Sequence, residues 1–146
     1  MKAFEFRLGR VADYRQQQAE IARTQLQAML ADLTRLDEQI ALLEARRSEA
    51  RTALSNQPQL TGADLLALSQ YQEHIARQIA RLAHTRREVA ASVEKQRTKT
   101  LEAERAVKLL GRMREKQLDS WKAECDRELD ALAADSYLAR LSAGLR

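Results

Sequence analysis

The chain has 146 residues, with 25 lysines and arginines against 21 aspartates and glutamates, so its formal net charge is +4. Four glycines, one proline and 4% aromatic residues leave few turn formers or large core fillers, which argues against a compact globular domain and favours an elongated helical one. No run of about eighteen apolar residues and no secretory signal pattern is present, so we expect a cytoplasmic protein.

The first part of the chain carries a heptad ladder. Starting at Leu8 and stepping alternately by four and three residues, the ladder ends at Leu54, and twelve of its fourteen positions are apolar. Heptad spacing keeps one seam of a helix facing a partner helix. The pattern predicts a first helix over about residues 4–55.

A loop is predicted over about residues 56–61. Pro58 is the only proline of the chain, and it cannot lie inside a helix. Thr61 has the character of a helix N-cap, with Asp64 three residues later, near the positive end of the next helix. The first helix should therefore end before Pro58, and a second should begin at about residue 62.

A second ladder runs from Leu65 to Leu110, and ten of its fourteen positions are apolar. If the loop fixes the register, residues that face each other have numbers that sum to 118 or 119 along both ladders. Arg47 then faces Gln72, and Ala22 faces Gln96. The sequence predicts an all-α fold, an antiparallel coiled-coil hairpin of two long helices that forms one domain over residues 1–146 and is a monomer.

Beyond Leu110 the heptad fails and the apolar spacing widens. A different stripe follows, with a period close to eleven residues. We expect the second helix, about residues 62–142, to overhang the first from about Lys116, at the end where the termini lie. An amphipathic helix without an internal partner is a docking element. The new stripe consists of Leu118, Trp121, Cys125, Leu129 and Leu132.

Signatures of catalysis and of cofactor binding are missing from the sequence. There is no glycine-rich phosphate loop, no Cys-x-x-Cys and no triad that spacing supports. His74 and His84 are too far apart on one helix to share a metal ion, and Cys125 is interpreted as a packing residue. We expect no enzyme activity, no cofactor, no metal and no small-molecule substrate.

The positive charge is concentrated in the second helix. Residues 60–115 carry eleven basic and seven acidic groups. Such a segment is a candidate for acidic partners, but interleaved glutamates such as Glu94 and Glu102 favour a solvated face with mixed ion pairs. They also argue against a nucleic-acid-binding hairpin, which needs an uninterrupted basic stripe.

Three segments are distinctive enough to compare with known families. They are Phe4-x-Phe6-x-Leu8-x-x-Val11 followed by Arg15, Glu20 and Ala22; Tyr71 with Ile75 and Ile79; and Leu129-Asp130 followed by Ala133 and Tyr137. Together they resemble the FliJ-type flagellar export proteins over nearly the whole chain. The sequence departs from that family where Arg46, Ala50 and His74 stand in place of aromatics found in some relatives, and where Ala131 replaces an acidic residue.

The resemblance implies a non-enzymatic coiled-coil component of the flagellar type III export apparatus, with a role in motility and chemotaxis. Such proteins act as a central stalk that binds and activates the hexameric export ATPase ring and links it to the membrane export gate, with export chaperones as further partners. The protein would be peripherally associated with the inner-membrane export apparatus. The implied ATPase-binding residues are Phe4, Phe6, Leu118, Trp121, Leu129, Leu132 and Tyr137. The implied gate-binding residues are Gln39, Leu43, Tyr71, His74, Ile75 and Gln78.

Two alternatives remain open from the sequence. One is the equivalent stalk protein of a virulence type III secretion system, and the other is a structural coiled coil that associates with itself.

Overall fold

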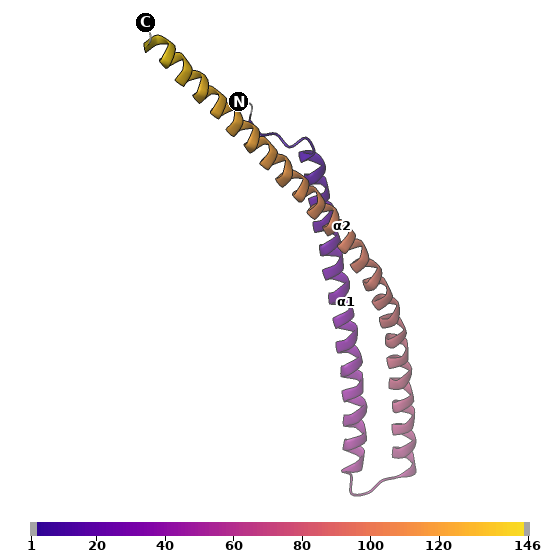
Figure 1. Cartoon of the computed structure of the whole chain (residues 1–146). Helices are drawn as coiled ribbons and strands as arrows, with labels where there is room; N and C mark the ends of the chain where they lie inside the picture. The colour runs from indigo at the N-terminus through magenta and orange to yellow at the C-terminus, as the bar shows by residue number, and fades with distance from the viewer. Residues whose placement is uncertain (1–2, 145–146) are drawn as a thin grey trace. The chain divides into compact units, whose positions relative to one another are not determined.

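The computed structural model describes residues 3–144, which form two helices, α1 (Gly9–Ser55) and α2 (Gly62–Gly144). The helices pack against each other and run in opposite directions, which confirms the predicted all-α antiparallel hairpin (Figure 1). Contacts divide the chain into two compact units, described one by one below: a hairpin unit, Ile21–Leu101, and a terminal unit, Met1–Glu20 with Glu102–Arg146. A single domain over residues 1–146 stays a prediction.

The loop between the helices ends in a capping box at the start of α2. Pro58 lies in the loop between Ser55 and Gly62, as predicted. The Asp64 amide donates to Thr61 Oγ1 at 3.2 Å, and the Thr61 amide and hydroxyl donate to Asp64 Oδ2 at 3.1 and 2.7 Å. These bonds satisfy donors at the start of α2 that no helical carbonyl reaches, and they confirm Thr61 as the N-cap. The hydroxyl and amide of Thr61 hold the pKa of Asp64 below its usual value.

The hydrophobic core of the hairpin unit is a narrow seam. Ile75 and Val93 are each 3% exposed, whereas Leu65, at the first step of the second ladder, is 53% exposed. The predicted register is confirmed by two pairs that were expected to face each other. Arg47 Nε donates to Gln72 Oε1 at 3.1 Å, and Gln96 Nε2 donates to the Ala22 carbonyl at 3.1 Å.

A buried polar layer interrupts the seam near one end of the hairpin unit. Gln96 and Thr100 are 6% and 5% exposed. Gln96 Nε2 also donates to Gln25 Oε1 at 3.2 Å, and the Thr100 hydroxyl lies 2.9 Å from the Gln96 carbonyl and 3.3 Å from that of Ala22. Because Ala22 has a small side chain, α1 and α2 approach closely enough here for side chains to reach the opposite backbone.

One exposed ion pair ties the two helices of the hairpin unit together. Arg86 occupies a seam position, and its guanidinium makes two contacts with the Asp37 carboxylate of α1. The pairing holds the pKa of Asp37 below its usual value and raises that of Arg86. The ladders did not predict this pair. Asp37 lies at the edge of the seam, one residue after Leu36, within reach of a long side chain from α2.

In the terminal unit, the N-terminal residues are not helical. The sequence predicted helix from about residue 4, but α1 begins at Gly9. Before it, residues 3–6 have no regular secondary structure and residues 7–8 form a turn, with Phe4, Phe6 and Leu8 half-buried and the three residues between and before them exposed. The Gly9 amide donates to the Phe6 carbonyl at 2.9 Å, in a turn that leads into the helix. The predicted start was wrong because this period of two buries both phenylalanines, which a helix could not do.

The C-terminal part of α2 becomes a single helix later than predicted. Leu118, Trp121 and Cys125 are half-buried, so the stripe is still covered beyond Lys116, where the overhang was expected to start. Every residue from 126 to 144 is exposed. The single-helix extension, defined here as residues 126–144, therefore exists as predicted but is shorter. Part of the cover before it comes from Phe4, which contacts Trp121 and which a ladder of helical residues does not reveal.

Candidate partner-binding surfaces

The first candidate surface lies in the terminal unit, where an aromatic pair joins the N-terminal segment to α2. The Phe4 and Trp121 rings lie 5.9 Å apart between centroids and are tilted by 54°. Tilted aromatic pairs at this distance are stabilising beyond the area that they bury. The sequence assigned Trp121 to the stripe of the overhang and, through the family resemblance, both residues to the ATPase contact. In the structure the two rings contact each other, and Phe4 covers part of Trp121.

The extension beyond this pair exposes large apolar side chains. Leu129, Leu132 and Tyr137, all predicted as partner contacts, are 48%, 64% and 64% exposed. Sequence reasoning missed Leu138 and Leu141, which are 61% and 46% exposed. Their spacing of three residues places both on one side of the helix, but this side differs from that of the predicted stripe from Leu118 to Leu132.

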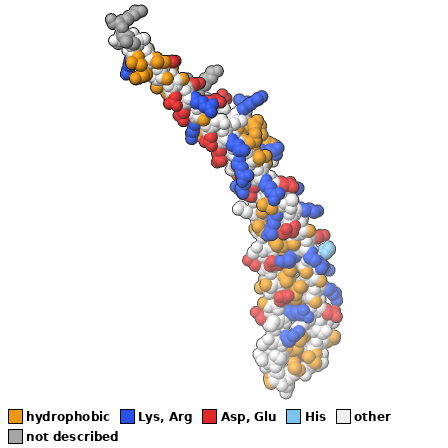
Figure 2. Space-filling view, viewed as in Figure 1, with side chains coloured by type: hydrophobic (Ala, Val, Ile, Leu, Met, Phe, Trp, Pro, Cys, Tyr) orange, Lys and Arg blue, Asp and Glu red, His pale blue; other side chains and the backbone are white. Residues whose placement is uncertain are grey.

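The extension is apolar on more than one side and acidic between those sides. Leu129 and Leu132 continue the stripe of Trp121 and Cys125, whereas Leu138 and Leu141 lie on another side of the helix. Residues 126–144 contain four acidic and two basic side chains. In Figure 2, hydrophobic side chains reach the surface near the C-terminal end of α2 with charged ones among them. Such a surface suits a partner that surrounds the helix better than one that lies along a single face.

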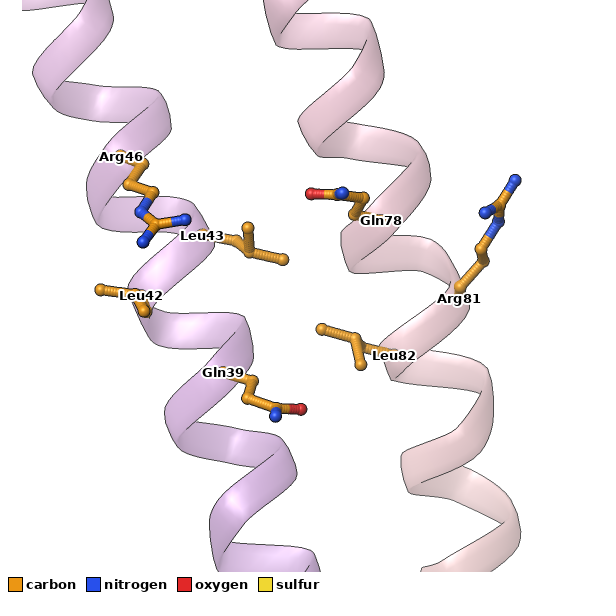
Figure 3. Close-up of a pocket in the computed structure, with 7 residues that line it drawn as sticks. All are labelled: Gln39, Leu42, Leu43, Arg46, Gln78, Arg81 and Leu82. Carbon is orange, nitrogen blue, oxygen red and sulfur yellow. The ribbon is translucent and has the colours of Figure 1, made fainter.

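The second candidate surface is a shallow hollow between the helices of the hairpin unit. Leu43 from α1 and Leu82 from α2 point toward each other in it, together with Gln39 and Gln78 (Figure 3). Its other lining residues are Leu42, Arg46 and Arg81. Within residues 3–144, neither of these arginines makes an ion pair. The hollow is thus an apolar floor beside two cations without a carboxylate partner.

The structure brings together some of the predicted gate-binding residues and buries another one in the seam. Gln39, Leu43 and Gln78 share the hollow, while Tyr71 lines a second one near the loop and His74 is exposed. Ile75 is buried in the seam, so a partner reaches it only if the helices separate.

Three lining residues of the hollow were not among the predicted contacts. Leu42, Arg46 and Arg81 flank the seam rather than lie in it. The ladder positions on which the sequence argument depended do not include them. A search for residues one position from the seam on facing helices would have found Arg46, because it directly precedes Arg47.

The basic residues of α2 are partly neutralised by neighbours. Arg77 pairs with Glu73 at 2.9 Å, and Arg97 pairs with Glu94 at 3.2 Å, in addition to the bridge from Arg86 to α1. This arrangement is the mixed solvated face that the interleaved glutamates favoured. Exposed pairs of this kind contribute little to stability.

Within residues 3–144, no group of three or more His, Cys, Asp or Glu side chains is placed to hold a metal ion. None of the described helices is both long and apolar enough to cross a membrane.

A helical hairpin with an exposed apolar extension and a shallow hollow offers surfaces suited to contacts with other proteins. The sequence profile described as Flagellar FliJ protein matches residues 4–143, and the chain belongs to this family. It is therefore a component of the flagellar export apparatus, in a family whose members are structural and not enzymatic. Comparisons with curated proteins and with solved structures gave no match.

Proposed function

We propose that the chain is the central stalk of the export apparatus, which binds and activates the hexameric export ATPase through the extension. The observation that carries this proposal is the exposure of Leu129, Leu132, Tyr137, Leu138 and Leu141 on more than one side of a single helix. A helix on the axis of a ring is contacted from several sides at once. A helix that docks in a groove needs only one apolar face.

The exposed side chains have enough apolar surface to bind a partner. Full burial of a leucine contributes about 1.5–3 kcal/mol, and Leu132 and Leu138 are both more than half exposed. Several such residues together would exceed the entropy that association costs if the partner surface is complementary. The membrane-associated location and a role in activating the ATPase both follow from this assignment.

The test is stimulation of the purified hexameric ATPase by the full chain. Leu132→Ala combined with Leu138→Ala should remove most of the stimulation, while far-UV circular dichroism stays unchanged because both side chains are exposed. The matched control is Leu66→Ala, an equally exposed leucine (60%) of the hairpin unit, which should stimulate like the wild type. Full stimulation by the double variant would refute the proposal.

We further propose that the hollow of the hairpin unit contacts the export gate. Its supporting observation is the facing pair of Leu43 and Leu82, flanked by the exposed Leu42 and by Arg46 and Arg81, which make no ion pair within residues 3–144. Leu42 is 53% exposed, so Leu42→Ala should leave the fold intact. This variant should bind the soluble domain of the gate protein more weakly yet stimulate the ATPase normally, which is the opposite of the Leu132/Leu138 variant. Equal gate binding by wild type and Leu42→Ala would count against this surface.

The family match favours the flagellar over the virulence system as the place of this stalk. We propose a cytoplasmic protein that is peripherally associated with the inner-membrane export apparatus, monomeric when free of its partners, with export chaperones as additional partners.

A further inference from the structure

Residues 3–8, called here the strap, cover part of the stripe on α2. Their side chains alternate between half-buried and exposed, and the Phe4 ring packs against Trp121 in a tilted arrangement. The backbone hydrogen bonds of the strap include the turn from Gly9 to Phe6 and the first helical bond, from Ala12 to Leu8. The strap contacts α2 through the aromatic pair of Phe4 and Trp121.

The stripe under the strap is continuous with the exposed stripe of the extension. Leu118, Trp121 and Cys125 are half-buried, and Leu129 and Leu132 follow them on the same side of α2 with helical spacing. One apolar stripe thus has a covered first half and an open second half. A partner that binds the open half along the helix axis meets the edge of the strap.

We propose that the strap is a displaceable cover of the partner-binding stripe, and that the apolar inner surface of the ATPase ring replaces it on Leu118, Trp121 and Cys125. This inference rests on the proposed function for the identity of the partner. Phe4 and Phe6 then act by competing with the ring for α2. The sequence had assigned both residues to the contact itself, so the two assignments predict opposite effects of removing the rings.

The chain contains its own reporters of the strap. Trp121 is the only tryptophan and Cys125 the only cysteine, and both lie on the covered half of the stripe. In the full chain, Phe4→Ala combined with Phe6→Ala should raise the rate at which a thiol reagent modifies Cys125 by about fivefold, because the reaction follows local opening. The emission of Trp121 should move to longer wavelength. Glu5→Ala, an exposed residue between the two rings, is the matched control and should change neither signal.

Binding to the hexameric ATPase decides whether the cover competes with the ring. The Phe4/Phe6 variant should bind about fivefold more tightly than the wild type, because it no longer has to release the strap. Equal or weaker binding would refute competition between the strap and the ring, and would indicate that Phe4 and Phe6 contact the ATPase themselves. If neither chain binds the ATPase, the proposed function fails. The rate of Cys125 modification still tests whether the strap covers the stripe. If the Phe4/Phe6 variant reacts no faster than Glu5→Ala, the strap does not cover Cys125.

Discussion

The burial of Ile75 gives the sharpest test of how this hairpin is held together. Ile75 is 3% exposed in the seam of the hairpin unit, yet the family resemblance placed it among contacts with the export gate. Ile75→Ala removes Cγ1, Cγ2 and Cδ1. At about 0.8 kcal/mol for each buried carbon, the transfer term alone is about 2.4 kcal/mol, and the cavity left behind raises the expected loss to about 3–5 kcal/mol.

Urea unfolding followed by far-UV circular dichroism measures this loss. The control is again Leu66→Ala, in the same unit and helix but 60% exposed, which should change the free energy of unfolding by less than about 0.5 kcal/mol. The comparison separates burial from the intrinsic helix propensity of alanine, because both variants introduce the same residue into α2.

Two results would refute the reasoning. If Ile75→Ala and Leu66→Ala unfold at the same urea concentration, the seam at Ile75 does not stabilise the hairpin. If Ile75→Ala keeps full stability but loses binding to the gate domain, Ile75 is a contact residue and its burial does not describe the protein in solution. Loss of both stability and binding, with binding restored at low temperature, is the expected pattern for a purely structural residue.

Three other variants test the polar contacts. Thr61→Ala should cost about 1 kcal/mol of unfolding free energy through loss of the N-cap, read as a lower urea midpoint. Asp37 and Asp64 have lowered pKa values in the folded protein, so their contribution to the free energy of unfolding is complete above their unfolded pKa of about 3.9 and is lost as the pH falls through the folded value. Asp37→Asn should therefore reduce the loss of stability on acidification. An unchanged pH dependence below about pH 4 would show that the bridge to Arg86 contributes nothing. Gln96→Glu places a carboxylate against the Ala22 carbonyl at a 6% exposed site, which should raise its pKa and destabilise the hairpin at pH 7, with partial recovery in acid as the group is protonated.

The sequence predicted the features that depend on local chemistry or on a regular repeat. Pro58 excluded helix from the loop, and Thr61 and Asp64 were recognisable as a cap because a capping box involves residues three apart. The two ladders predicted which residues face each other, since a short loop fixes the register of an antiparallel pair. Arg47 with Gln72 and Ala22 with Gln96 are in contact for this reason.

The features that were missed join residues without a shared repeat. The contact between Phe4 and Trp121 links a non-helical segment to a helix, and no heptad argument relates the two. A local signal did exist, because Phe4, Phe6 and Leu8 alternate with Glu5 and Arg7, which is the period of an extended chain and not of a helix. The bridge from Arg86 to Asp37 was missed because a long side chain can select among several acceptors near the seam.

The extension has a physical advantage that follows from its continuity with α2. An isolated peptide of residues 126–144 would first have to nucleate a helical turn, which is unfavourable in water. Here α2 is already formed and packed up to Cys125, so each further residue adds a hydrogen bond without a new nucleus. A partner that binds Leu129 and Leu132 therefore meets an ordered helix and does not have to supply the free energy of folding a disordered tail, which lowers the cost of association. The same continuity makes the strap effective, since a short segment that covers Trp121 controls access to a stripe that is already in its binding conformation.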